Sequence, residues 1–181
     1  MTETFADFHF QPFLMEALKD LHFVKPTPVQ EKVIPIVLAN KSVVGQSQTG
    51  SGKTHAFLLP IFEQLDAQNQ NVQVVITTPS RELAYQIYNA AKQLNRFAPQ
   101  KFTIHNYVGG TDKQHQIDQL QRKQPQLVIG TPGRILDLIN SQALDIHTAH
   151  RFVVDEADMT LDMGFLEQVD GIASHFPEDL Q

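Results

Sequence analysis

The stretch SQTGSGKT, residues 47–54, has the residue types and spacing of a loop that holds phosphate. Between a strand and a helix, such a loop points backbone N–H groups and a helix N-terminus at one spot, which suits an anion. Its glycines let the backbone curl closely, Lys53 can reach the outer phosphates, and the Thr54 hydroxyl can bind Mg²⁺. An ordinary strand-to-helix turn is the alternative, but few turns need these residues in this order. The sequence therefore predicts a nucleotide site formed by Ser47, Gln48, Thr49, Gly50, Ser51, Gly52, Lys53 and Thr54.

A nucleotide bound with Mg²⁺ also needs a carboxylate, and FVVDEAD at residues 152–158 can supply it. Asp155 follows an apolar run and is predicted to hold the metal through water, whereas Glu156 is predicted to orient or deprotonate an attacking water. Lys53, Asp155 and Glu156 are therefore the candidate catalytic residues. The alternative for these acids is an N-cap of the next helix, an interpretation that is plausible for Asp158.

Alternating strand and helix patterns must position these residues. Short β-branched runs predict buried strands at residues 42–45, 72–78, 102–108, 126–130 and 151–155. Apolar residues at steps of three and four predict helices at 54–64, 80–97, 113–121 and 132–139, and further helices within 10–40, broken at KPTP. This alternation predicts an α/β fold, a mostly parallel sheet with helices on both faces and ligands at the carboxyl ends of the strands.

Composition limits the remaining possibilities. The 181 residues, 41% of them hydrophobic, predict one domain over 1–181 with no visible internal boundary. The net charge of −6 argues against a surface that attracts polyanions everywhere, so any nucleic-acid contact should be local. The chain has no cysteine, no basic and apolar leader and no apolar run long enough to span a bilayer. We therefore expect a cytoplasmic protein without a membrane partner.

Taken together, TGSGKT and DEAD resemble the DEAD-box family of ATP-dependent RNA helicases, specifically the first of their two RecA-like P-loop NTPase domains. The resemblance implies ATP and Mg²⁺ as cofactors. HFVKPTPVQ at 22–30 is similar to the family's Q motif, with Phe5 as its upstream aromatic and His22 where the family usually has glycine. By this resemblance Phe23 stacks on adenine, Lys25 belongs to the nucleotide site, and Gln30 hydrogen-bonds the edge of the base. Read alone, the same stretch would be a core aromatic before a capped helix.

Three further segments are similar to the family's RNA-contacting segments: PSRELA at 79–84, the pair at 109–110, and TPGR at 131–134. By the resemblance they bind the RNA backbone without sequence preference, through helix N-termini, arginines, a hydroxyl and close approach at glycine. Read separately, they would be turns and helix starts. The RNA-binding residues implied are Pro79, Arg81, Gly109, Gly110, Thr131, Gly133 and Arg134.

The resemblance also implies parts that this sequence does not contain. A Ser-Ala-Thr strand would follow shortly after Gln181 and lie between the strands at 42–45 and 151–155, and Asp158 would couple to a second RecA-like domain. We therefore expect a C-terminally truncated chain that binds nucleotide, hydrolyses it poorly and has weak RNA affinity. Its sheet should show a distorted centre or another segment in the gap. Two alternatives stay open: another P-loop ATPase acting on DNA or protein, and a non-catalytic RNA-binding scaffold.

Overall fold

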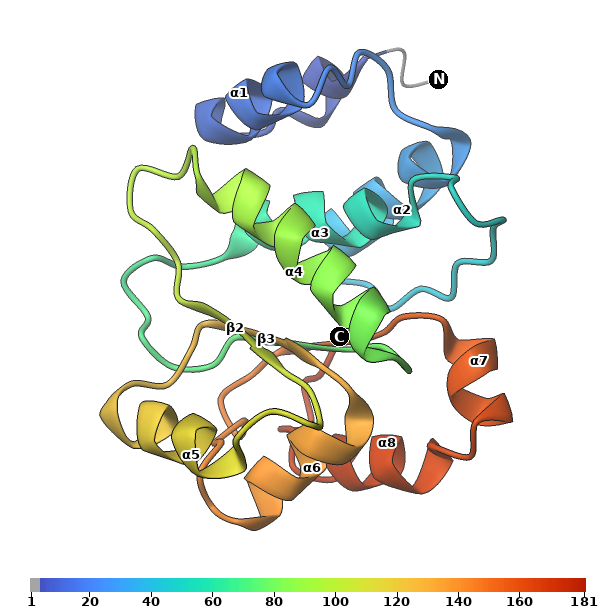
Figure 1. The fold of residues 1–181 in the computed structure, drawn as a ribbon. Helices are drawn as coiled ribbons and strands as arrows, with labels where there is room; N and C mark the ends of the chain where they lie inside the picture. Colours follow the sequence, from blue (N-terminus) through green and yellow to red (C-terminus); the bar gives the residue numbers. More distant parts are fainter. Residues whose placement is uncertain (1–3) are drawn as a thin grey trace. The chain divides into compact units, whose positions relative to one another are not determined.

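In the computed structural model, which describes residues 4–181, four β-branched runs form a parallel sheet. Figure 1 shows the path of the chain through the sheet and its helices. The strand order is β2-β3-β1-β4, so that β1 lies between β3 and β4. Their bounds are β1 (Val74–Thr77), β2 (Ile104–Tyr107), β3 (Leu127–Gly130) and β4 (Arg151–Val154). Every residue of β1 and β3 is buried, which explains why these runs are mostly apolar rather than alternating in polarity.

The described residues form two compact units. The first contains the chain up to Asp66 together with Ala90–Lys101 and Gln181, and the second contains Ala67–Asn89 and Phe102–Leu180. The second unit therefore holds the whole sheet. Helix α4 (Arg81–Asn95) contributes residues to both units, so the boundary between them does not follow a loop.

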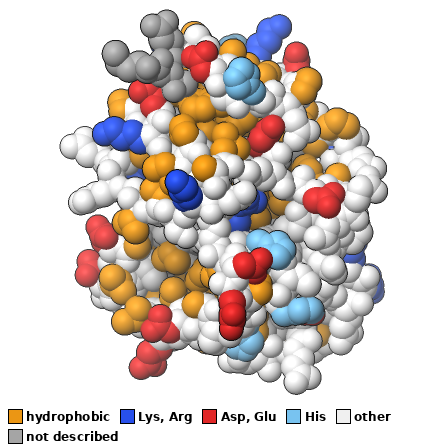
Figure 2. Space-filling model, turned by 180° about the vertical axis from the view of Figure 1, so that it is seen from behind, with side chains coloured by type: hydrophobic (Ala, Val, Ile, Leu, Met, Phe, Trp, Pro, Cys, Tyr) orange, Lys and Arg blue, Asp and Glu red, His pale blue; other side chains and the backbone are white. Residues whose placement is uncertain are grey.

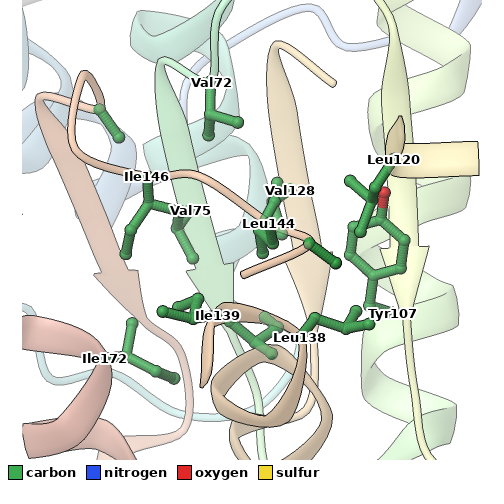
Figure 3. Packing of buried hydrophobic residues seen from close by; sticks show 13 residues of the cluster. Val72, Val75, Tyr107, Leu120, Val128, Leu138, Ile139, Leu144, Ile146 and Ile172 are labelled. Carbon is green, nitrogen blue, oxygen red and sulfur yellow. The ribbon is translucent and has the colours of Figure 1, made fainter. Parts of the chain in front are cut away.

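The core of the second unit lies between the sheet and three helices (Figure 3). These are α5 (Lys113–Arg122), α6 (Pro132–Asn140) and α8 (Leu166–Ala173), and the short α7 (Ala157–Asp162) precedes α8. Val75 and Val128 of the sheet share a buried cluster with Leu138 of α6 and Ile172 of α8, all of them without measurable exposure. Burial of this apolar surface, at about 25 cal/mol per Å², holds the strand ends and the loops that follow them in place.

The first unit is helical. Its elements are the 3₁₀ helix η1 (Phe5–Phe8), α1 (Pro12–Asp20), α2 (Pro28–Leu38) and α3 (Lys53–Gln64). Proline occupies the first position of both α1 and α2, where its missing N–H costs nothing. Helices α2 and α3 pack together, burying Ile34 of α2 and Phe62 of α3 completely. This packing fixes the start of α3, which follows the glycine-rich loop.

One predicted strand is wrong. Residues 41–48 have no regular structure, and Val44 of the expected strand at 42–45 is 99% exposed. A four-residue β-branched run gains ladder hydrogen bonds only beside a partner strand, and no described segment pairs with it. Among residues 4–181, β4 ends the sheet and pairs only with β1, so the expected filling of the gap by another segment is not seen. The other four predicted strands, the four predicted helices and the two helices within 10–40 are confirmed, with ends shifted by a few residues.

Candidate functional site

The glycine-rich loop, residues 47–54, is held by hydrogen bonds between its own residues. Gly50 has φ +79 and Gly52 has φ +90, conformations that glycine adopts without strain. Lys53 opens α3, whose N-cap residue is Gly52 and therefore has no side chain for capping. The Lys53 ammonium donates a hydrogen bond to the Ser47 carbonyl at 3.0 Å, and the Ser47 and Ser51 hydroxyls lie 2.7 Å apart. The loop thus combines backbone amide groups, a helix N-terminus and a cation, which are the requirements for holding a phosphate group.

Gln30 connects this loop to the segment at 22–30. Its side chain is 3% exposed, and its Nε2 donates to the Gly52 carbonyl at 3.1 Å. Its Oε1 accepts from the Thr27 backbone N–H at 3.0 Å, while the Thr27 hydroxyl accepts from the Gln30 N–H at 3.4 Å, so the pair forms a capping box at the start of α2. Each amide atom retains one further hydrogen-bonding position, one donor and one acceptor. Those are the two groups that the edge of an adenine base would require.

Phe23, the other residue expected at adenine, is half-buried in the same unit. Its ring meets the His55 imidazole edge to face, with ring centroids 4.9 Å apart. Burial lowers the pKa of His55, so the ring is neutral near pH 7. Phe5 is 3% exposed, while Lys25 is exposed. A pocket of about 410 Å³ beside Phe23 is lined by Thr4, Phe5, Ala6, Met15, Leu18, Lys19, His22, Phe23 and Val24, and by none of residues 47–54.

The two acids expected to act in catalysis lie at the end of β4 in the second unit. The Asp155 backbone N–H donates to the Thr77 carbonyl at 2.8 Å, and the Thr78 hydroxyl donates to the Asp155 carboxylate at 3.3 Å. Glu156 occupies the N-cap position of α7 with φ +50, and its side chain makes no capping hydrogen bond. The alternative that Asp158 caps this helix is wrong, because the helix already begins at Ala157. Asp158 lies exposed in its first turn.

The segments expected to contact RNA meet around the turn at 109–110, within the second unit. Gly110 has φ +79, and a Cβ placed on it would lie 2.7 Å from Arg81 Cζ. Only glycine therefore lets the Arg81 guanidinium lie against this turn. Pro79 is buried before Arg81, and the Ser80 hydroxyl accepts a hydrogen bond from the Leu83 N–H at 3.2 Å in the first turn of α4.

The segment at 131–134 also lies beside this turn. Thr131 is the N-cap residue of α6, but its hydroxyl makes no capping bond. Arg134 Nη1 donates to the Thr111 carbonyl at 3.1 Å and to Gln116 Oε1 at 2.8 Å. Gly133 is exposed, with nothing within 4 Å of a Cβ placed on it. The structure therefore brings Arg81, Gly109, Gly110, Thr131 and Arg134 into one neighbourhood, which we call the arginine cluster.

The surface charge agrees with a local rather than a general attraction for polyanions. On the face drawn in Figure 2, acidic side chains are spread among uncharged ones, and Lys and Arg form no continuous basic area. No helix within residues 4–181 is both long and apolar enough to cross a bilayer. A nucleic-acid contact would therefore depend on a few placed cations and backbone groups.

Three residues with a part in these sites were not singled out from the sequence: His55, Thr78 and Gln116. The threonine cap expected at the start of the helix after KPTP is confirmed at Thr27, where threonine before proline with glutamine three positions later forms a capping box. His55 directly follows the glycine-rich loop, but nothing in its spacing predicts contact with Phe23. Gln116 looks like an ordinary surface residue in the polar run that forms α5, and only the structure shows that it is buried.

A parallel α/β sheet with an anion-binding loop before a helix defines a nucleotide-binding class of protein. A family model described as DEAD/DEAH box helicase matches residues 27–181, so the chain belongs to that family. It is 54% identical over 98% of its length to the DEAD-box ATP-dependent RNA helicase CshB of Listeria monocytogenes, and 52% identical over its whole length to CshB of Bacillus subtilis.

Two solved structures share the fold. A DEAD box protein from Methanococcus jannaschii matches 99% of the chain with a TM-score of 0.92 and 36% identity. Dbp5 of Saccharomyces cerevisiae, in a structure with RNA and ADP BeF₃, matches 99% with a TM-score of 0.88 and 30% identity. The chain covers 40% and 42% of the two CshB proteins, and 48% and 45% of these two solved chains. The predicted RecA-like α/β fold is confirmed.

Proposed function

We propose that this chain is the ATP-binding part of an RNA-dependent ATPase that remodels or locally unwinds RNA duplexes. The observation that carries the proposal is the hydrogen bond from the Gln30 amide to the Gly52 carbonyl. It joins a group suited to reading adenine directly to the loop suited to holding phosphates. A loop that only bound phosphate would have no need of this connection.

In the nucleotide site, each residue has a role that follows from its chemistry. The N–H groups of residues 47–54 and the start of α3 bind the phosphates, and Lys53 leaves the Ser47 carbonyl for the outer ones. Phe23 is proposed to stack on the base, and its T-shaped contact with His55 helps to fix the orientation of the ring. The remaining donor and acceptor of Gln30 distinguish adenine from guanine, whose edge presents a carbonyl where adenine has an amino group.

Mg²⁺ is proposed to enter the site with the nucleotide rather than to be held by the protein alone. Within residues 4–181 no group of three or more His, Cys, Asp or Glu side chains could hold a metal ion. Mg²⁺ in such sites keeps several waters and binds substrate phosphates with one or two protein oxygens. Thr54 and Asp155 would supply those oxygens, Asp155 through water, and the ion would neutralise phosphate charge. The Thr78 hydroxyl orients the Asp155 carboxylate, and Glu156 accepts a proton from the attacking water.

RNA is proposed to bind along the arginine cluster through its backbone. Arg81 and Arg134 supply positive charge, and the Thr131 hydroxyl, which makes no capping hydrogen bond, supplies a donor. The turn at 109–110 allows the sugar-phosphate backbone to approach closely. In the whole protein, a second RecA-like domain would bind the other side of the strand, with Asp158 at the contact. It would also supply an arginine of the kind worth roughly 10³ to 10⁵ in rate. This chain alone is therefore expected to bind RNA weakly and turn over ATP slowly.

Calorimetric binding of ADP and GDP with Mg²⁺ tests the proposal. The chain should bind ADP and discriminate against GDP, and Gln30→Ala should reduce ADP affinity while narrowing the difference between the two nucleotides. Gln30→Glu is the matched variant. It keeps an acceptor for the Thr27 N–H but loses the donor to Gly52, and it should lose discrimination as well.

Each result separates the open possibilities. Equal binding of ADP and GDP by the wild-type chain would indicate a general P-loop NTPase, such as one acting on DNA or protein. No binding by a chain with the expected helix content would favour the non-catalytic scaffold. Retained discrimination in a folded Gln30→Ala variant would show that another residue reads the base.

A further inference from the structure

Gln116 is the buried polar residue next to the arginine cluster. It lies on α5 and is 6% exposed, with Leu120 buried one turn further along the same face. A buried amide is costly unless both its ends are hydrogen-bonded. Gln116 Nε2 donates to the Thr111 hydroxyl at 2.8 Å, and its Oε1 accepts from Arg134 Nη1 at 2.8 Å. Both ends of the amide are therefore committed to residues around the turn at 109–110.

The direction of this chain of hydrogen bonds is fixed. The Thr111 hydroxyl donates to the Val108 carbonyl at 2.7 Å, so its proton is in use and it can only accept from Gln116. The NH₂ group of Gln116 must then face Thr111, and its carbonyl must face Arg134. Hydrogen bonds linked in this way polarise and strengthen one another. Val108 directly follows β2, so the end of this strand determines, through Thr111 and Gln116, which nitrogen of Arg134 is hydrogen-bonded.

Arg134 is held by neutral acceptors. Its hydrogen bonds go to the Thr111 carbonyl, the Thr111 hydroxyl at 3.5 Å and Gln116, all of them from Nη1. Within residues 4–181 no carboxylate pairs with it, and the adjacent Asp112 uses its side chain to cap α5. Nε and Nη2 form the edge of the guanidinium that suits bidentate binding of a phosphate.

We propose that Gln116 is a positioning residue, which holds Arg134 by Nη1 so that the opposite edge of its guanidinium meets a backbone phosphate of RNA. The inference rests on the proposed RNA contact of the arginine cluster and adds a residue that does not itself touch RNA. Neutrality of Gln116 is part of the role. A carboxylate in its place would hold Arg134 equally well, but it would cancel the charge that attracts the phosphate.

The test measures binding of a fluorescent oligouridine to the whole 181-residue chain at several salt concentrations. Arg134→Ala should weaken binding about tenfold and reduce the slope of log K against log salt by about 0.7, the value for one phosphate contact on a single strand. Gln116→Glu should weaken binding and reduce the salt slope by nearly as much as Arg134→Ala does. Gln116→Met, which removes the acceptor and keeps the volume, should weaken binding while leaving the slope unchanged, because the charge remains.

Gln114→Glu is the matched control. It makes the same change of charge on the same helix, but Gln114 is exposed and bonds Asp118 instead. It should alter binding less than about twofold, because exposed charges are screened. Helix content by circular dichroism confirms folding of each variant, and the Arg134 Nε–H resonance reports the guanidinium directly. In Gln116→Met this resonance should show faster rotation of the guanidinium.

The outcomes separate the two claims. If the wild-type chain and Arg134→Ala bind oligouridine equally, or neither binds, the RNA site is wrong and the role of Gln116 is overturned with it. If Arg134→Ala loses affinity but Gln116→Glu and Gln116→Met behave like the wild type, the RNA site stands and positioning by Gln116 is overturned. Equal losses in Gln116→Glu and Gln114→Glu would also overturn it, because helix charge alone would then explain the effect.

Discussion

Two glycines of the loop at 47–54 permit a matched pair of substitutions, and their comparison tests the link between the loop and Gln30. Both glycines have positive φ, +79 at Gly50 and +90 at Gly52. A Cβ at Gly50 would meet nothing within 4 Å, whereas one at Gly52 would lie 2.6 Å from Gln30 Nε2 and 3.0 Å from Thr27 Oγ1. Alanine at either position carries the same backbone strain, but only at Gly52 does it push the Gln30 amide away from the Gly52 carbonyl.

The expected difference in unfolding free energy between the two alanine variants follows from these contacts. The left-handed conformation costs a residue with a Cβ about 1–2 kcal/mol, which is the whole expected effect of Gly50→Ala. Gly52→Ala should add about 0.5–1.5 kcal/mol for the displaced hydrogen bond, giving about 1.5–3.5 kcal/mol in all. In a Gln30→Ala background that addition should disappear, so the double-mutant cycle should show a coupling of the same size.

Urea unfolding followed by circular dichroism is the suitable assay, because the chain has no tryptophan to report by fluorescence. The two alanine variants are compared in the wild-type and the Gln30→Ala backgrounds. Equal losses for Gly50→Ala and Gly52→Ala would refute the reasoning, as would a coupling between Gly52 and Gln30 that is indistinguishable from zero. Either result would mean that the contact between the loop and the amide is not formed in solution.

Three further predictions concern the second unit. Gly130→Ala should destabilise it by about 1–3 kcal/mol in urea unfolding, because the added Cβ would overlap the Tyr107 carbonyl of the neighbouring strand. Leu138→Ala, at a fully buried position, should cost about 2–5 kcal/mol in the same assay, and a loss below 1 kcal/mol would contradict the packing in Figure 3. Burial lowers the pKa of His105 below its ordinary 6.5. The contribution of the neutral ring to stability is therefore complete above about pH 6.5 and is lost as pH falls through the lowered pKa of the folded state. His105→Gln should therefore flatten the dependence of unfolding free energy on pH between about 7 and 5, and an unchanged pH dependence would contradict this assignment.

The sequence predicted elements well where local chemistry determines them. The helix at 28–38 has proline at its first position and a capping box, and its start could be placed from the residues alone. The strand at 42–45 failed for the opposite reason. Its residues have strand propensity, but a strand is stabilised by its partner, and propensity cannot show whether a partner is present.

At the candidate sites, backbone requirements could be predicted and side-chain partners could not. His22 stands at a turn where the resemblance places glycine, and it adopts φ +58, so the histidine accepts the conformation that the turn demands. Gln116 and His55 become meaningful only through contacts with residues distant in sequence. A glutamine in a polar helix predicts a solvated side chain, and only the fold reveals that this one is buried against Arg134.

Strand order accounts for how the proposed roles are distributed along the sheet. The segments of the arginine cluster follow β2, β3 and β1, which are neighbours in the order β2-β3-β1-β4, and the acids at 155–156 follow β4 at the edge. In sequence, the segment at 131–134 is nearer to Asp155 than the segment at 79–81. In the sheet the reverse holds, because β1 separates β3 from β4 and the Thr78 hydroxyl after β1 reaches the Asp155 carboxylate. The residue that orients the acid therefore lies on the same connection as Arg81, a proximity created by the parallel crossovers and invisible in the linear order of the motifs.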